Sequence, residues 1–366
     1  FNRLLTDSVY VELYNDKHFK LTADVEFDSL EWTPLGIFPR DFSYTGFDGV
    51  FDGGGHTISG LVIKSDTAGF FAVANHASIF NFGIKNSSVQ GEVAGGIVGA
   101  VKVDGTIENC WNDNTSVYGA SSAGGLVGGK VLDSSSDLKL IFDRTYNTGT
   151  IRGKGYVGGI IGKHVANTIV TNSFNRGVVE YAGLPEYKHW LGGIIGDDVG
   201  SIRYTYNVGE VRDYGTITHT LISSNSYDIN ETNARLRDDD IDPFGLTEEE
   251  MRSKEFAERM GEAFVYDSKN QNDGYPMLAS DLVKPSSVAI PRNIVPKVNS
   301  SLKVAASMRS LFVSGLVPGE SLAIVNMKGE KVWLGRATSS SQVLPVKNPG
   351  VYVVATKSRA IRVRVK

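Results

Sequence analysis

Acidic side chains that could act on a glycosidic bond are adjacent at Asp197 and Asp198. Glycosidases use a pair of carboxyl groups, and polysaccharide lyases use a base beside Ca²⁺. Asp113 and Asp143, nearer the N-terminus, could extend the pair into an acidic strip. Because a fold does not imply an active site, we favour solvated turns for these carboxylates. Asp197 and Asp198 are the catalytic candidates if the protein is an enzyme.

Aromatic and polar side chains, the mixture that contacts sugar rings, are concentrated in residues 180–190. These residues are an insertion in one copy of a sequence repeat, and insertions in repeat proteins become loops, often on the binding face. The candidate ligand contacts are Tyr181, Tyr187, His189 and Trp190. The alternative is a loop that packs over its own part of the fold.

Motifs of common catalytic centres are absent from the 366 residues. The sequence contains no His-Glu-x-x-His zinc motif and no Gly-x-Ser-x-Gly nucleophile elbow. The acidic run at residues 238–240 lacks the spacing of an EF-hand. Cys110 is the only cysteine and suits a small packed position better than a reactive thiol. We therefore predict neither a metal nor a cofactor.

A repeated five-residue phrase organises the chain. Gly-Gly, two aliphatic residues and Gly begin at residues 95, 124, 158 and 192, at intervals of 29, 34 and 34 residues. An aromatic residue followed by Asn recurs in phase, as Trp111-Asn112, Tyr146-Asn147, Phe174-Asn175 and Tyr206-Asn207. Such periods are typical of stacked units. Two strand-like phrases per repeat, without helical periodicity, predict an all-β fold with a right-handed parallel β-helix.

Stacking of the coils about 4.8 Å apart would align equivalent residues along the solenoid. The aromatic residues would then form one ladder and the Asn residues a second. Asn side chains can hydrogen-bond from coil to coil, and Asn tolerates the left-handed backbone of a tight turn. Rings at the same position of every coil more often pack as core than face a ligand. We therefore predict a packing role for the aromatic ladder.

The repeated phrases resemble the GLUG-motif repeat of bacterial surface proteins. Phrases at residues 106–110 and 146–149, between the Gly-rich copies, carry the same resemblance. Flanking phrases at residues 19–25, 32–36, 51–58 and 272–276 extend it over about residues 19–280. The resemblance implies a protein of the bacterial surface or exterior. GLUG repeats also accompany some immunoglobulin-cleaving metallopeptidases, whose zinc motif these residues do not contain.

Charge is divided unevenly along the chain. From Lys284 onward there are 14 Lys and Arg and two acidic residues, a net charge of +12, whereas the preceding part carries −16. This change, together with the Pro-containing residues 284–299, predicts a domain boundary and a linker. No signal peptide or spanning helix is visible. Since the chain begins at Phe1, we interpret it as a processed or truncated product.

We predict four segments: a β-solenoid at 1–223, a closing segment at 224–283, a linker at 284–299 and a small basic β-sandwich at 300–366. In the closing segment, Thr247 and Glu250 form a capping box that opens one helix, which would cover the open edge of the last coil. Seven strand-like runs predict the β-sandwich. Phrases within the last 40 residues resemble the C-terminal sorting domain of type IX secretion, which implies export and surface attachment or release.

These observations favour a secreted or surface-displayed bacterial adhesin that binds a polysaccharide or a host-cell glycan through one face of the solenoid. The expected partners are this glycan and the secretion machinery. We expect no nucleic acid, because no exposed aromatic motif accompanies the basic region, and no transmembrane segment. Two alternatives stay open: a polysaccharide lyase or glycoside hydrolase that uses Asp197 and Asp198, and a structural spacer for a missing N-terminal module.

Overall fold

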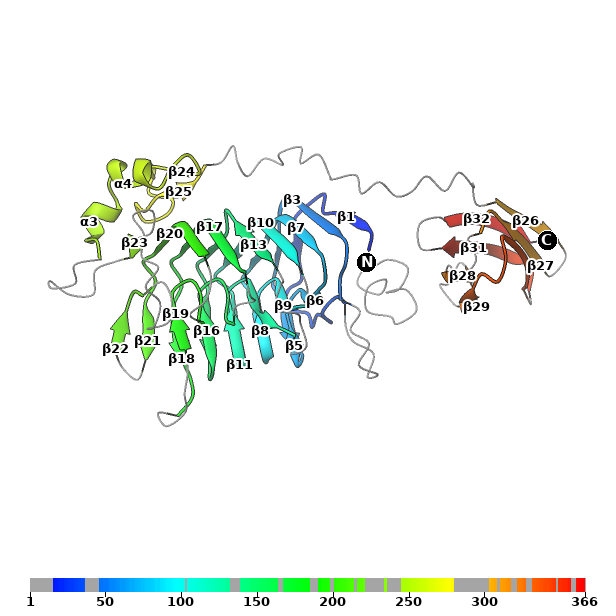
Figure 1. Ribbon diagram of the computed structural model, residues 1–366, viewed down its shortest axis with the longest axis horizontal. Coiled ribbons are helices and arrows are strands. Elements are labelled where there is room, and N and C mark those ends of the chain that lie inside the picture. The colour runs from blue at the N-terminus through cyan, green and yellow to red at the C-terminus, as the bar shows by residue number, and fades with distance from the viewer. Residues whose placement is uncertain are drawn as a thin grey trace. The chain divides into compact units, whose positions relative to one another are not determined.

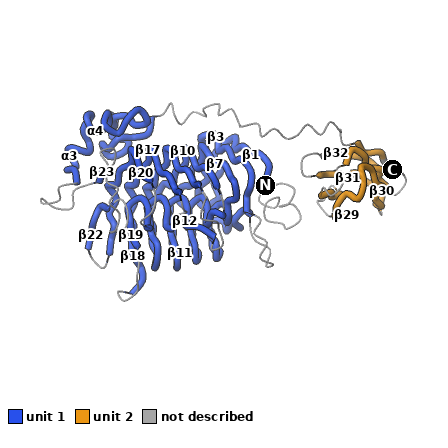
Figure 2. Tube along the Cα trace, viewed as in Figure 1, with its two compact units in different colours: residues 1–6, 15–286 blue, residues 7–14, 287–366 orange. Residues whose placement is uncertain are grey.

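Figure 1 shows the protein as a computed structural model. The described residues are 16–36, 46–102, 104–131, 139–163, 167–184, 190–197, 201–213, 216–220, 234–235, 245–279, 303–307, 310–316, 321–326, 331–346, 348–356 and 360–365. They form two compact units, one within residues 16–279 and one within residues 303–365 (Figure 2). The predicted linker at 284–299 lies outside the described residues.

Stacked parallel strands make the first unit a β-solenoid of about six coils. Its first sheet contains β1 (His18–Lys20), β2 (Val25–Glu26), β3 (Val50–Ser59), β7 (Ser78–Lys85), β10 (Gly105–Asp113), β13 (Leu140–Asp143), β14 (Tyr146–Asn147), β17 (Ile169–Asn175), β20 (Ser201–Asn207) and β23 (Ala234–Arg235). Its second sheet contains β4 (Val62–Lys64), β5 (Thr67–Ala68), β8 (Ser88–Gly95), β11 (Ser116–Gly124), β15 (Thr150–Gly153), β16 (Tyr156–Gly158), β18 (Val179–Tyr181), β19 (Trp190–Gly192), β21 (Val211–Asp213) and β22 (Thr216–Thr218). A third sheet contains β6 (Phe71–Ala74), β9 (Val98–Val101) and β12 (Val127–Lys130). Adjacent described strands of the solenoid are parallel, except that β22 is antiparallel to β21, so the predicted parallel β-helix is confirmed.

The repeated Gly phrase occupies the same place in successive coils. Gly124 lies in register with Gly95 on one side and with Gly158 on the other. The first aliphatic residue of each phrase is fully buried, at Ile97, Leu126, Ile160 and Ile194. Glycine is required because the backbones approach closely: a Cβ on Gly158 would lie 1.9 Å from the carbonyl oxygen of Ile161. Each sequence repeat is therefore one coil, as predicted.

The predicted Asn ladder is also present. Asn112 donates to Asn147 at 2.8 Å, Asn147 to Asn175 at 2.7 Å and Asn175 to Asn207 at 2.8 Å, always from Nδ2 to Oδ1. The left-handed backbone that we associated with these Asn residues is found three positions earlier in each coil. There the residues with positive φ are Asn109, Arg144, Asn172 and Tyr204. The hydrogen-bonded Asn ladder and the left-handed backbone thus occupy different positions of one coil.

The described residues of the closing segment form two short helices, α3 (Glu248–Met251) and α4 (Lys254–Arg259), and the hairpin of β24 (Phe264–Val265) and β25 (Met277–Leu278). The capping box is confirmed, since Thr247 Oγ1 accepts from the backbone N–H of Glu250 and the Glu250 carboxylate accepts from that of Thr247. The prediction of one helix is wrong. The backbone of Arg252 leaves the helical conformation, and Ser253 then caps α4 by accepting from the N–H of Phe256.

The closing segment packs against the side of the solenoid. Its buried residues Met251, Phe256 and Met260 share one apolar core with Phe174 and Tyr206 of the first sheet. We expected a helix across the open edge of the last coil; the same core contains Ala234 of the last strand, β23, and also covers outward-facing rings of two coils. Docking of the segment is favourable because it removes the apolar surface of these aromatic side chains from water.

The described residues of the second unit form a β-sandwich of seven strands, as predicted. One sheet contains β26 (Lys303–Ser307), β27 (Ser310–Ser314) and β30 (Ser341–Pro345), and the other contains β28 (Ser321–Asn326), β29 (Lys331–Arg336), β31 (Gly350–Thr356) and β32 (Ala360–Val365). Leu311 and Val313 from the first of these sheets pack with Ile324 and Val354 from the second. Within the described parts of the chain, no helix is long and apolar enough to cross a membrane.

Candidate functional site

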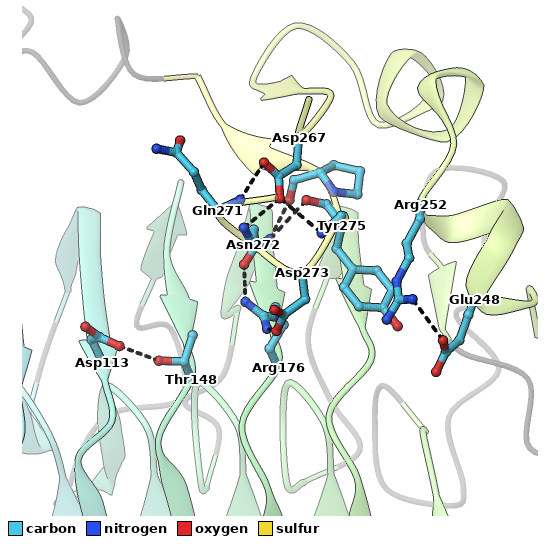
Figure 3. Close-up of polar contacts among 12 residues, drawn as sticks. Asp113, Thr148, Arg176, Glu248, Arg252, Asp267, Gln271, Asn272, Asp273 and Tyr275 are labelled. Atoms are coloured by element: carbon cyan, nitrogen blue, oxygen red, sulfur yellow. Dashed lines mark hydrogen bonds and ion pairs between the residues drawn. The ribbon is translucent and has the colours of Figure 1, made fainter. Parts of the chain in front are cut away.

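A groove of about 550 Å³ lies between the first sheet and the loop that precedes β25 (Figure 3). Its floor consists of outward-facing side chains of β10, β14 and β17, and residues 271–278 form one wall. In Figure 3, Asp113, Thr148 and Arg176 extend from the solenoid, and Asn272 points toward Arg176 from the loop. The groove therefore joins parts of the chain that are far apart in sequence.

The floor contains three rings of the aromatic ladder, those of Trp111, Tyr146 and Phe174. Trp111 stacks on Tyr146 with ring centres 6.2 Å apart, Tyr146 on Phe174 at 4.9 Å and Phe174 on Tyr206 at 5.1 Å. Side chains alternate across a strand, so each ring points outward while the following Asn points inward. The closing segment buries Phe174 and Tyr206, and it leaves Trp111 and Tyr146 half-buried. The predicted packing role is correct for Phe174 and Tyr206, although the edge of Phe174 also lines the groove. Trp111 and Tyr146 are the two rings that stay partly exposed there.

Trp111 is the first ring of this ladder. The residue in register with it in the preceding coil is Gly83, which has no side chain. A Cβ on Gly83 would lie 2.0 Å from Nε1 of Trp111, so the indole occupies the space above that glycine. Among the described residues, none accepts a hydrogen bond from the indole N–H, and Tyr146 is the ring that stacks on Trp111. The indole therefore offers both apolar surface and a donor to a ligand.

Tyr146 contributes a hydroxyl group to the same floor. Burial, and to a lesser extent the negative charge of Asp113, raises the pKa of the Tyr146 phenol far above its usual value. The phenol is therefore protonated at every physiological pH and can both donate and accept a hydrogen bond.

Charged groups along the groove are paired with one another. Arg144 donates from Nε to Asn109 at 2.8 Å and forms ion pairs with Glu108 and with Asp143. Paired groups of this kind stay in place and can still share their remaining N–H donors or oxygen lone pairs with a ligand.

The other charged groups of the groove are also paired. Arg176 pairs with Asp273 and donates to Asn272. Asp113 accepts from the Thr148 hydroxyl at 2.9 Å and lies 2.9 Å from the ammonium of Lys85. These contacts hold the polar rim of the groove in a defined arrangement.

The wall of the groove is held by Asp267, which is 5% exposed. Its carboxylate accepts from the backbone N–H groups of Gln271 at 2.8 Å, Asn272 at 2.6 Å and Gly274 at 3.0 Å. Burial alone would raise the pKa of Asp267, but these N–H groups outweigh it and hold the pKa below its usual value. Asn272 in turn donates to the hydroxyl of Tyr206 at 3.2 Å, which connects the wall to the ladder.

Replacement of Asp267 by Asn is expected to destabilise the wall by about 2 kcal/mol at neutral pH, because neutral Asn accepts more weakly from the three backbone N–H groups. A carboxyl group with a lowered folded-state pKa stabilises the fold above its unfolded pKa, and this stability is lost as the pH falls through the folded value. The difference between the two proteins should therefore shrink below about pH 4. Denaturation midpoints between pH 3 and pH 7 measure it, and a difference that stays constant would contradict this role.

No protein-family model matches the chain, and no curated protein matches it either. A solved structure from Bacteroides ovatus, named a "putative immunoglobulin A1 protease", is similar with a TM-score of 0.53. The two are 19% identical, and the match covers 72% of this chain and 86% of that chain. At this identity the likeness shows a shared fold and nothing about the site.

Tyr181 and Trp190, the described residues of the predicted ligand-binding set, lie on the second sheet and do not line the groove. Tyr181 is 7% exposed, and its hydroxyl donates to the carbonyl of Leu184 at 3.1 Å, so its ring packs over its own coil. Trp190 is half-buried and stacks on Tyr156 with ring centres 4.3 Å apart. Tyr187 and His189 lie outside the described residues.

The carboxylates proposed for an enzyme are only partly within the described residues. Asp197 is half-buried, and Asp198 lies outside the described part of the chain. Asp113 borders the groove, whereas Asp143 pairs with Arg144 and accepts from Asn172 at 2.7 Å. Where the chain is described, it contains no group of three His, Cys, Asp or Glu residues suited to a metal ion.

Cys110 has the packing role that we predicted. The residue is fully buried, and its Sγ–H donates to the carbonyl of Glu108 at 3.2 Å. Burial raises the pKa of the thiol strongly, so the reactive thiolate does not form at neutral pH.

Sequence reasoning missed the groove, although it singled out most of its parts. The aromatic-Asn phrase identified Trp111 and Tyr146, and the family resemblance identified residues 272–276. Nothing in the local sequence shows that the closing segment covers two rings of the ladder and leaves two accessible. That distribution depends on a contact between distant parts of the chain.

Proposed function

We propose that this protein is a secreted or cell-surface β-solenoid that binds a glycan in the groove above Trp111 and Tyr146. The observation that supports it is the presence of two accessible rings beside fixed donors and acceptors in one 550 Å³ groove. A pyranose has apolar C–H surfaces and a rim of hydroxyl groups. Aromatic residues can cover the former while amide, hydroxyl and carboxylate groups bind the latter.

The polar groups of the groove suit hydroxyl recognition. The indole N–H of Trp111 donates, the phenol of Tyr146 donates or accepts, and the amide of Gln271 does both. Asp113 keeps acceptor capacity on its carboxylate beyond its bonds to Thr148 and Lys85. An extended ligand could follow the groove along the stacked coils, because each coil repeats the same backbone spacing.

Export to the cell surface is part of the same proposal. It is supported by the resemblance of the repeats to GLUG proteins and of the second unit to a type IX sorting domain. The protease name of the Bacteroides ovatus structure is not extended to this chain, because a shared fold at 19% identity carries no catalytic site. A glycan-degrading activity is tested by the same experiment as binding.

Trp111→Ala is expected to weaken glycan binding by about tenfold or more, because the loss of one aromatic contact costs about 1.5 kcal/mol. The full-length protein is incubated with insoluble xylan, mannan, cellulose and chitin, and its depletion from solution is measured. Soluble oligosaccharides released during the incubation are measured in the same samples.

Trp190→Ala is the matched control, since Trp190 is a half-buried, stacked tryptophan of the second sheet. Loss of binding in Trp190→Ala with normal binding in Trp111→Ala would contradict the groove and identify the insertion at 180–190 as the binding surface. Release of oligosaccharides would contradict a pure binding function and favour the enzyme alternative. No depletion by any polymer would favour the structural spacer.

A further inference from the structure

We infer that the groove takes an uncharged glycan, and that Asp273 sets this preference by neutralising Arg176. The inference rests on the proposed glycan-binding function and names the class of ligand. It follows from how the charges that border the groove are arranged: each cation among the described residues of the groove has a carboxylate partner.

The first cation is Arg144, which lines the groove near its floor. Two carboxylates, Glu108 and Asp143, and the amide oxygen of Asn109 occupy its guanidinium. Because two carboxylates already neutralise this guanidinium, its remaining N–H donors add little net attraction for the carboxylate or sulfate of an acidic sugar.

The second cation is Arg176, whose side chain is 19% exposed. Figure 3 shows its guanidinium next to Asn272 and Asp273, the two residues that it contacts. In contrast to Arg144, it has a single carboxylate partner among the described residues. The side chain of Asp273 is 65% exposed. The positive charge of Arg176 is therefore neutralised by one surface residue, which belongs to the wall of the groove.

The remaining charges form the pair of Lys85 and Asp113, 2.9 Å apart. The groups named here comprise three cations and four carboxylates, an excess of one negative charge. An acidic sugar would have to lose water beside Asp113 and Asp273 without gaining an unpaired cation, which is unfavourable. A neutral sugar meets no such barrier. Paired charges therefore act against acidic ligands while they leave hydroxyl recognition intact.

Asp273→Asn tests this assignment. The substitution removes the carboxylate and leaves Arg176 beside Asn272 as an unpaired guanidinium, the group best suited to bind a carboxylate or sulfate in two places. We expect the affinity for acidic polymers, relative to neutral ones, to rise about tenfold. The full-length protein is measured by affinity electrophoresis in gels that contain polygalacturonate, chondroitin sulfate, soluble xylan or soluble mannan.

Two controls isolate the groove. The basic residues beyond Lys284 can retard the protein in any acidic gel, so only retardation that Trp111→Ala abolishes is attributed to the groove, in both the wild-type and the Asp273→Asn background. Glu249→Gln removes one exposed carboxylate of α3 without a contact to Arg176, and it should leave the ratio of acidic to neutral affinity unchanged.

Three results would overturn the inference. Wild-type protein that binds acidic polymers through Trp111 as strongly as neutral ones shows that the pairing does not exclude them. An unchanged ratio in Asp273→Asn shows that Asp273 does not set the preference. Absence of Trp111-dependent binding to every polymer removes the proposed function itself, and this result is distinct from the first two because neutral polymers also fail.

Discussion

Asn175→Ala is expected to lower the free energy of unfolding by about 3–5 kcal/mol. The buried amide of Asn175 accepts from Asn147 and from the backbone N–H of Gly177, and it donates to Asn207 and to the carbonyl of Gly177. Alanine would remove all four bonds at once. The neighbouring amides cannot reach water in a position that is 0% exposed, so each lost bond costs more than it would at the surface.

Chemical denaturation followed by far-UV circular dichroism measures this loss. Asn75→Ala is the control, because Asn75 is half-buried and its side chain has no hydrogen-bond partner among the described residues. The control should change stability by less than about 0.5 kcal/mol. Equal effects at the two positions would show that the amide ladder does not hold the coils together. Conversely, a large and specific loss at Asn175 would establish the ladder as the main polar link between coils.

Phe256→Ala is expected to release the closing segment from the solenoid, at a cost of about 3–5 kcal/mol in the free energy of that contact. Phe256 is 3% exposed, and its ring lies edge-on to Tyr206 with centres 5.9 Å apart. Its removal leaves a cavity between α4 and the ladder. Because Asn272 and the wall of the groove belong to the same segment, glycan binding should weaken together with the attachment.

Hydrogen–deuterium exchange of residues 245–279 measures the release, and the exchange of the coils reports whether the solenoid itself stays folded. Glu255→Ala, at an exposed position of the same helix, is the matched control and should leave exchange unchanged. Unaltered protection of residues 245–279 in Phe256→Ala would contradict the view that this ring fastens the segment. Faster exchange confined to the segment would show that the groove wall can detach from an intact solenoid.

The aromatic ladder is one continuous row of side chains with two uses. At Phe174 and Tyr206 the rings serve as a docking surface for the closing segment. At Trp111 and Tyr146 the same kind of ring is accessible beside polar groups. The chemistry that makes an aromatic residue a good packing element, a large apolar body with one polar atom, also makes it a good contact for a sugar.

The C-terminal unit shows which elements short sequence patterns can predict. Its seven strand-like runs were placed correctly because each is a short run with β-branched and other apolar residues, and turn-forming residues separate the runs. In the closing segment the same local approach found the capping box at Thr247 but placed only one helix there. Ser253 is a good N-cap and so begins a second helix at a point where propensity alone continues the first.

The sequence by itself determined the solenoid, its coil boundaries and both ladders, because a repeat aligns identical residues wherever coils stack at constant spacing. The identity of the accessible rings was decided by tertiary structure. Asn272 contacts Tyr206 from 66 residues away, and Asp273 contacts Arg176 from 97 residues away. Such contacts have no period and no local signature, so the four ring positions look equivalent in the sequence. Only the docked segment buries two of them and leaves the other two partly exposed in the groove.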